Sequence, residues 1–127
     1  MQTITTSSAP AAIGPYSQAI LSGNTLYASG QIPINPASGQ IEARDIAAQT
    51  EQACKNVGEI LKAAGMGFEN VVKTTCFLSD IADFATFNEV YAKYFVSRPA
   101  RSCVAVKDIP KGALCEIEIT ARSNKAA

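Results

Sequence analysis

No histidine occurs among the 127 residues of this chain. Its absence excludes histidine-based acid–base catalysis, serine–histidine triads and the usual histidine-containing metal sites. The 11 Lys and Arg residues balance 11 Asp and Glu residues and form no basic run, so the charge does not favour nucleic-acid binding. No hydrophobic run approaches the length of a membrane span. The sequence therefore predicts neither a metal site nor a membrane protein, and its chemistry must come from other side chains.

The four cysteines are widely separated, and none forms the C-x-x-C spacing of redox and metal motifs. Residues 1–5 have neither the basic nor the apolar segment of a secretory signal, so we expect a cytoplasmic protein with reduced thiols. We expect Cys54, Cys76 and Cys115 to pack in the core as small hydrophobic side chains. The length predicts one domain over residues 1–127, with a frayed tail at 123–127.

Hydrophobic patterns and turn residues predict six strands and two helices. The predicted strands cover residues 3–6, 17–21, 25–29, 71–78, 99–106 and 114–122. Asp45 is the predicted N-cap of a helix that stops at Gly65, and Asp83 that of a second helix with an aromatic face over residues 84–95. This order predicts an α+β fold, a mixed sheet backed on one face by two helices. Because the other face lacks a clean polar pattern, we expect a homo-oligomer to bury it.

Two of these strands, 99–106 and 114–122, combine residues typical of buried strands with charges. A buried charge costs several kcal/mol unless a partner or ligand meets it. An ion pair between Arg101 and a glutamate of the last strand accounts for the charges as well as a functional interpretation does. In the functional interpretation, the guanidinium of Arg101 binds a small carboxylate, and Glu116 or Glu118 polarises a water or shuttles a proton.

Three further residues have two interpretations each. Cys103, two residues from Arg101, is either a nucleophile activated by that charge or, as is more common, an inert buried thiol. Gly30 ends a predicted strand and indicates a bulge or a close approach of another group to the backbone. The aromatic face of the second helix is more typical of a core than of a ligand pocket, but Asn88 lies off that face and is available for a polar role.

Six segments match, in order, the signature of a known family. They are AAIGPYSQ (11–18), SGQIP (29–33), VKTT (72–75), DFATFN (83–88), PARSCV (99–104) and LCEIEI (114–119). Over almost its whole length the chain resembles the RidA/YjgF reactive-intermediate deaminases. One departure is a short link before Pro99, with Arg98 where an aromatic is common, which leaves the preferred substrate side chain open.

The resemblance implies a chorismate-mutase-like fold assembled as a homotrimer, with sites between subunits. It also implies hydrolysis of 2-imino or 2-enamino acids, such as 2-iminobutanoate and 2-iminopropanoate, to 2-keto acids and ammonia, without a cofactor. By correspondence, Arg101 binds the substrate carboxylate and Glu116 positions or activates water, the two meeting only across a subunit boundary because their strands are not neighbours. The remaining implied pocket residues are Tyr16, Ser29, Gly30, Asn88 and Cys103.

Two other classes of function stay open. One is a non-catalytic module that binds or senses 2-keto acids or amino acids through the same cleft. The other is RNA cleavage or translation inhibition, which the zero net charge and the absence of histidine disfavour.

Overall fold

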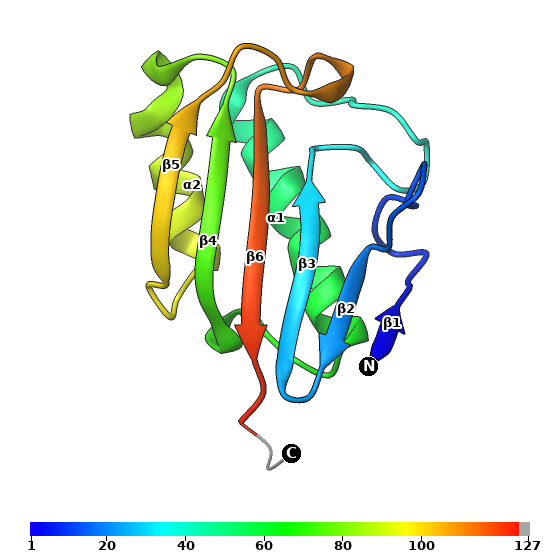
Figure 1. Cartoon of the computed structure of the whole chain (residues 1–127). Helices are drawn as coiled ribbons and strands as arrows, with labels where there is room; N and C mark the ends of the chain where they lie inside the picture. Colours follow the sequence, from blue (N-terminus) through cyan, green and yellow to red (C-terminus); the bar gives the residue numbers. More distant parts are fainter. Residues whose placement is uncertain (125–127) are drawn as a thin grey trace.

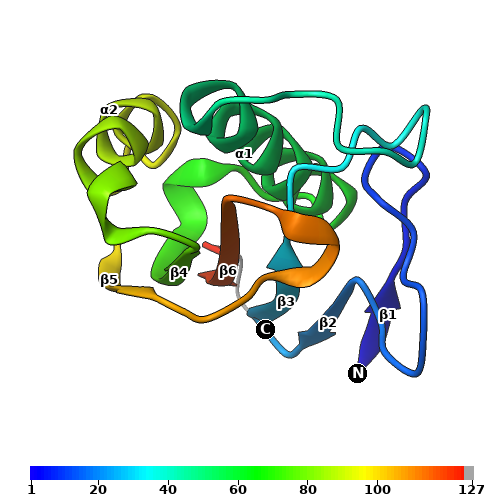
Figure 2. The same ribbon diagram turned by 90° about the horizontal axis from the view of Figure 1, so that it is seen from above.

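The computed structural model describes residues 1–124, which form six strands and two α-helices. The elements are β1 (Gln2–Ile4), β2 (Ala19–Ser22), β3 (Thr25–Gln31), α1 (Ile46–Ala63), β4 (Val71–Leu78), α2 (Phe84–Tyr94), β5 (Ala100–Ala105) and β6 (Cys115–Arg122). The strands form one sheet in the order β1-β2-β3-β6-β4-β5 (Figure 1). Figure 2 shows both helices on the same side of this sheet. The predicted α+β architecture is confirmed.

The last strand of the chain lies in the middle of the sheet. β6 pairs antiparallel with β3 on one side and with β4 on the other, and β4 in turn pairs parallel with β5. A parallel pair needs a crossover connection, and α2 supplies it between β4 and β5. Since β4 separates β5 from β6, the implied separation of the Arg101 and Glu116 strands is confirmed.

Both ends of α1 follow the predicted local chemistry. The Asp45 carboxylate accepts a hydrogen bond from the backbone N–H of Ala48 at 2.8 Å, which caps the first turn. At the other end Gly65 has a φ of +73°, and the N–H of Met66 donates to the carbonyl of Leu61 at 2.9 Å. This is the Schellman arrangement, which requires a left-handed residue after the helix.

The predicted cap of α2 is wrong in its detail. Asp83 occupies the N-cap position, but its side chain makes no capping hydrogen bond. The reason is a 3-10 turn, Ile81–Asp83, which places Asp83 in the right-handed helical region instead of an extended conformation. The Asp80 carboxylate accepts from the N–H of Ala82 at 2.9 Å and caps this turn instead.

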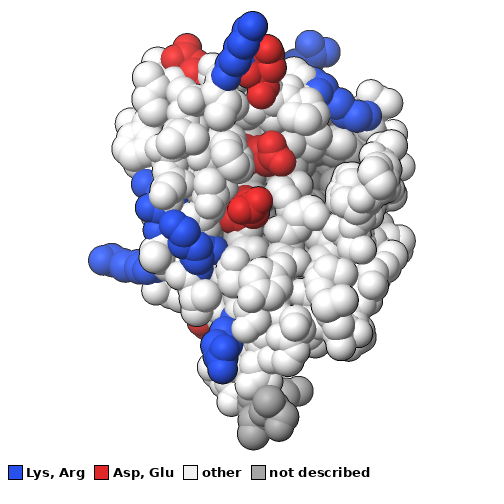
Figure 3. All heavy atoms as spheres, in the orientation of Figure 1, with Lys and Arg blue, Asp and Glu red and all other residues white. Residues whose placement is uncertain are grey.

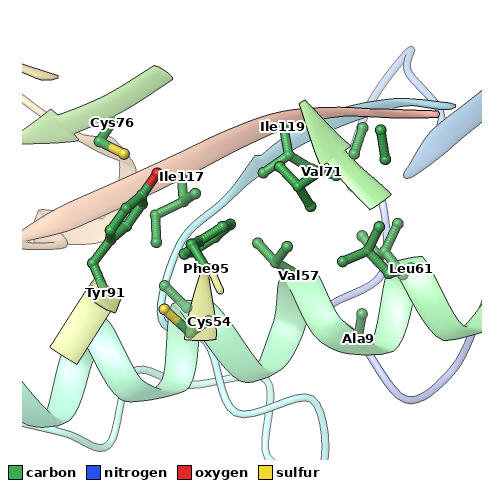
Figure 4. Packing of buried hydrophobic residues seen from close by; sticks show 14 of the residues in the cluster. Ala9, Cys54, Val57, Leu61, Val71, Cys76, Tyr91, Phe95, Ile117 and Ile119 are labelled. Carbon is green, nitrogen blue, oxygen red and sulfur yellow. The ribbon is translucent and has the colours of Figure 1, made fainter. Parts of the chain in front are cut away.

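The core lies between the helices and the sheet (Figure 4). Cys54, Cys76 and Cys115 are each fully buried, so their prediction as packing residues is confirmed. Burial raises the pKa of Cys76 and Cys115 to about 12, and these thiols therefore stay protonated. Other large side chains packed there include Leu26, Val57, Leu61, Phe87, Phe95, Ile117 and Ile119.

The N-terminal segment departs from the predicted strand bounds because of one buried amide. The Gln18 side chain accepts from the N–H of Thr6 at 2.7 Å and donates to the carbonyl of Pro10 at 2.8 Å. These bonds hold residues 6–10 as a loop against the start of β2, so β1 ends at Ile4 and not at residue 6. No helix in the described part of the chain is both long and apolar enough to span a membrane.

The prediction that strand 99–106 is buried is wrong for the single chain. β5 is an edge strand, and Ala100, Ser102 and Val104 are exposed on the side away from the helices. Figure 3 shows this uncovered face of the sheet, most of which is uncharged. Of the predicted tail, Ser123 donates its N–H to the carbonyl of Asn24 at 2.8 Å, and residues 125–127 lie outside the described part.

Candidate functional site

Arg101 extends from β5 toward α2. In the parallel register it stands opposite Thr74, which is fully buried on the helix side of the sheet. Its Nη1 donates to the Oδ1 atom of Asn88 at 2.7 Å. Its guanidinium carbon also lies 4.8 Å from the ring centroid of Tyr91 and 5.5 Å from that of Phe84, within cation–π range. The charge is therefore held by neutral partners.

A pocket of about 330 Å³ opens beside this guanidinium. It is lined by Asn88, Tyr91, Ala92, Phe95, Arg98, Pro99 and Arg101, without a carboxylate. Among the described residues, the Nε and Nη2 atoms of Arg101 have no hydrogen-bond partner. A planar guanidinium with a free edge can bind a carboxylate through two parallel hydrogen bonds.

Cys103 shares this face of β5, opposite the buried Cys76. Its thiol is half-buried, and burial raises its pKa although the Arg101 charge acts in the opposite direction. Thiol nucleophiles need a lowered pKa. The structure therefore favours the inert interpretation of Cys103 over a nucleophile.

Glu116 lies in a different cleft, of about 360 Å³, on the other side of the sheet. The cleft is lined by Pro10, Ala11, Ile13, Tyr16, Gln18, Gly30, Gln31, Ile32, Ile34, Pro110, Lys111 and Glu116. Burial, together with the negative charge of Glu118, raises the pKa of the Glu116 carboxyl above its usual value. A raised carboxyl pKa suits a group that accepts and returns a proton during a reaction.

Gly30 makes room for this carboxyl. A β-carbon at position 30 would stand 2.9 Å from the Glu116 carboxyl carbon and closer still to one of its oxygens. The register between β3 and β6 also shifts at this point, between Ala28 and Gln31. Both predicted meanings of Gly30, a bulge and a close approach, are confirmed.

Of the other implied pocket residues, Tyr16 and Asn88 each line one of the two clefts, and Ser29 lines neither. Tyr16 is half-exposed and lines the Glu116 cleft, where its hydroxyl accepts from the N–H of Ile13 at 3.3 Å. The Ser29 hydroxyl points elsewhere and donates to the carbonyl of Ser17 at 2.6 Å. Asn88 belongs with Arg101, as described above.

Arg101 and Glu116 do not meet within one chain. Arg101 is in register with the buried Thr74 on the helix side, whereas Glu116 pairs with Phe77, whose side chain faces the uncovered side. In the described part of the chain, Arg101 has Asn88 as its hydrogen-bond partner and forms no ion pair with a glutamate. The ion-pair interpretation is wrong, because the pleat points the two side chains to opposite faces.

Sequence reasoning missed Tyr91, Phe84 and Lys111. The sequence pattern places both aromatics on the core face of α2, but with Asn88 they contact Arg101, from positions i (Phe84), i+4 (Asn88) and i+7 (Tyr91). That spacing was the available signal, and Asn88 does not lie off the face, as predicted, but shares this side. Lys111 lines the Glu116 cleft and lies in a turn, where its own φ is +60°. The hydrophobic pattern of the sequence does not indicate that this turn reaches the cleft.

Comparison with known proteins identifies the family of this chain. Residues 6–123 match the family model described as endoribonuclease L-PSP. The chain belongs to this family, that of the RidA/YjgF proteins. The predicted resemblance is confirmed.

Individual RidA/YjgF relatives are similar over almost their full length. The chain is 56% identical over 119 residues to the human 2-iminobutanoate/2-iminopropanoate deaminase, which covers 93% of this chain and 87% of the human protein. The crystal structure of the Escherichia coli YjgF product is 46% identical, with a TM-score of 0.92 and coverage of 98% and 100%. That of E. coli TdcF with bound serine is 41% identical, with a TM-score of 0.93 and the same coverage.

Proposed function

We propose that this chain hydrolyses reactive 2-imino and 2-enamino acids, such as 2-iminobutanoate and 2-iminopropanoate, to 2-keto acids and ammonia. The names of its deaminase relatives from human, rat and cow support the reaction class. Two observations support the assignment of roles. A guanidinium held with one free edge suits a carboxylate anchor, and a carboxyl with a raised pKa suits a proton carrier.

We propose further that the site is assembled between subunits of a homotrimer with a chorismate-mutase-like fold. The opposite directions of Arg101 and Glu116 support this, because a substrate can touch both only if they come from different chains. The edge strand β5 and the uncovered face, most of which is uncharged, also suit contact with another subunit (Figure 3). Sedimentation of the purified protein tests the assembly, and a monomer at micromolar concentration would contradict it.

In the proposed reaction Arg101 binds the substrate carboxylate and places C2 of the imine near Glu116. An imine carbon is already electrophilic, so the site needs positioning and a proton relay more than a strong nucleophile. Glu116 takes a proton from a water as the water oxygen bonds to C2, and passes it to the imine nitrogen. The same relay moves the proton of the new hydroxyl to nitrogen as the C–N bond breaks, leaving a keto acid and ammonia.

The remaining residues have supporting roles in this proposal. Asn88 holds Arg101, and Gly30 leaves the space that the Glu116 carboxyl occupies. Tyr16 lines the Glu116 half of the substrate site, and Cys103 lies on the same face of β5 as Arg101. The Ser29 hydroxyl ties residue 17 to β3 and so supports the strand that carries Gly30.

A purified-protein assay tests the proposal. Fresh 2-iminobutanoate is produced by a pyridoxal-phosphate threonine dehydratase, and formation of 2-ketobutanoate is followed with and without this protein. We expect Arg101→Ala to lose about 100-fold or more in kcat/KM, since two charge-assisted hydrogen bonds are removed. Arg44→Ala, an exposed arginine outside both clefts, is the matched control. Equal activity of wild type and Arg101→Ala would overturn the assignment.

A non-catalytic binding module is the second candidate, favoured by the bound serine in the TdcF structure. Calorimetry that detects keto-acid binding without hydrolysis of any imine would support it. RNA cleavage is the third, favoured only by the family's description as endoribonuclease. Failure to bind RNA at any salt concentration would exclude it, because phosphate binding is strongly salt-dependent.

A further inference from the structure

One side of α2 forms a seat for the Arg101 guanidinium. Phe84, Asn88 and Tyr91 follow one another at helical spacing, so their side chains line one stripe. The Oδ1 atom of Asn88 accepts a hydrogen bond from Nη1, and the rings of Phe84 and Tyr91 contact the guanidinium group. A long arginine side chain otherwise samples many rotamers, and ordering it costs free energy on binding.

The seat is itself anchored to the sheet. The Tyr91 and Thr74 hydroxyls form a hydrogen bond of 2.7 Å in the core, where Tyr91 is 8% and Thr74 0% exposed. Thr74 is also the register partner of Arg101 across β4 and β5. The Tyr91 ring stacks on Phe95, with 4.2 Å between ring centroids. Contacts therefore run in a closed loop through β4, α2 and β5.

We propose that Tyr91, anchored through Thr74, is a positioning residue that orients the Arg101 guanidinium for a substrate carboxylate. It acts before the ligand arrives. Because Asn88 occupies Nη1 and the rings contact the planar group, the Nε and Nη2 edge remains for a two-pronged carboxylate. The ligand's identity rests on the proposed function, but the orientation of the guanidinium does not.

The orientation is tested without any ligand by nuclear magnetic resonance of the Arg101 side chain. Loss of a signal in Arg101→Lys identifies its Nε–H resonance. We expect this resonance to be shifted by the ring currents of Tyr91 and Phe84, to keep its shift in Tyr91→Phe, and to lose the Tyr91 contribution in Tyr91→Leu. An unshifted resonance in the wild type would overturn the proposal.

The consequence for binding is tested by calorimetry with 2-ketobutanoate and by steady-state kinetics. We expect Tyr91→Leu to raise Kd and KM about tenfold, because the Arg101 side chain must then be ordered when the ligand binds, with kcat changed less than twofold. Tyr91→Phe and Thr74→Val, which retain a ring at position 91, should each raise them about two- to threefold through loss of the anchoring hydrogen bond. These two conservative variants carry the test if Tyr91→Leu folds poorly.

Measuring Tyr91→Phe in the Arg101→Ala background distinguishes the positioning role of Tyr91 from a purely structural one. If Tyr91 acts through Arg101, adding Tyr91→Phe to Arg101→Ala causes no further loss of keto-acid affinity or residual activity. The same loss in both backgrounds would refute the positioning role. A wild type that shows the shifted Arg101 resonance and binds keto acid but hydrolyses no imine would refute the proposed deaminase function and leave the seat intact.

Discussion

The two clefts handle their charged groups in opposite ways. Arg101 is held by an amide and two aromatic rings beside a pocket without carboxylates, so its position is prepared and its charge permanent. The Glu116 carboxyl has no hydrogen-bond partner among residues 1–124, and burial pushes it toward the protonated form. A fixed cation is suited to binding, whereas a carboxyl that changes its protonation easily is suited to proton transfer. In the proposed site, binding therefore falls to the Arg101 half and proton transfer to the Glu116 half.

Removing the Glu116 carboxylate should give the largest effect on the chemical step. We expect Glu116→Gln to lower kcat about 100-fold or more, the typical contribution of a general base, with KM nearly unchanged. Arg101→Ala should instead act mainly on KM. Steady-state kinetics of both variants with 2-iminobutanoate measure the contrast. If both substitutions raise KM and spare kcat, the division between binding and chemistry is wrong.

Crowding Glu116 without removing it should have an intermediate effect. Gly30→Ala places a methyl group against the Glu116 carboxyl, so we expect the carboxyl to move and kcat to fall about tenfold, since small misplacements of catalytic groups are costly. Gly23→Ala is the matched control. Its methyl group meets no atom within 4 Å, but its φ of +60° disfavours alanine, so stability should fall with kcat unchanged.

Thermal unfolding of both variants separates these outcomes. A kcat loss in Gly23→Ala equal to that in Gly30→Ala would show that the loss follows stability and not the position of Glu116.

The smallest expected effect comes from replacing Glu118, the negative charge near the Glu116 carboxyl. Glu118 raises the pKa of Glu116, so Glu118→Gln should lower that pKa. The proposed base works when ionised, so activity rises with pH through the folded-state pKa of Glu116. The acidic limb of the kcat profile should therefore move to lower pH, by less than about one pH unit because Glu118 is exposed to solvent. If the acidic limb of the kcat profile is unchanged in Glu118→Gln but lost in Glu116→Gln, Glu118 has no influence on the pKa of Glu116.

Local sequence patterns were sufficient for much of the fold. The Asp45 cap, the Gly65 stop and the burial of the core cysteines follow from interactions within a few residues or from hydrophobicity alone. The bounds of β1 could not be read this way. They depend on the side-chain amide of Gln18, which accepts a hydrogen bond from the backbone N–H of Thr6, 12 residues away in the chain.

The sequence predicts which residues belong to the candidate site better than it predicts how they are arranged in space. The signature segments identified Arg101 and Glu116, and Gly30 was expected to meet a close neighbour. The seat on α2 was missed because the aromatic residues fit a core equally well by periodicity. Only the position of β5 relative to α2 shows that Phe84 and Tyr91 contact a cation.

Residue order was sufficient to predict the number and type of the main elements, the coarse architecture, and Arg101 and Glu116 as charges in need of a partner or ligand. Those properties depend on residue type and on spacing along the chain. The tertiary structure alone decided that Arg101 and Glu116 face opposite sides of one sheet, and that Arg101 is bound by neutral partners. These facts depend on the register of strands far apart in the chain, and a shift of one residue would reverse the faces.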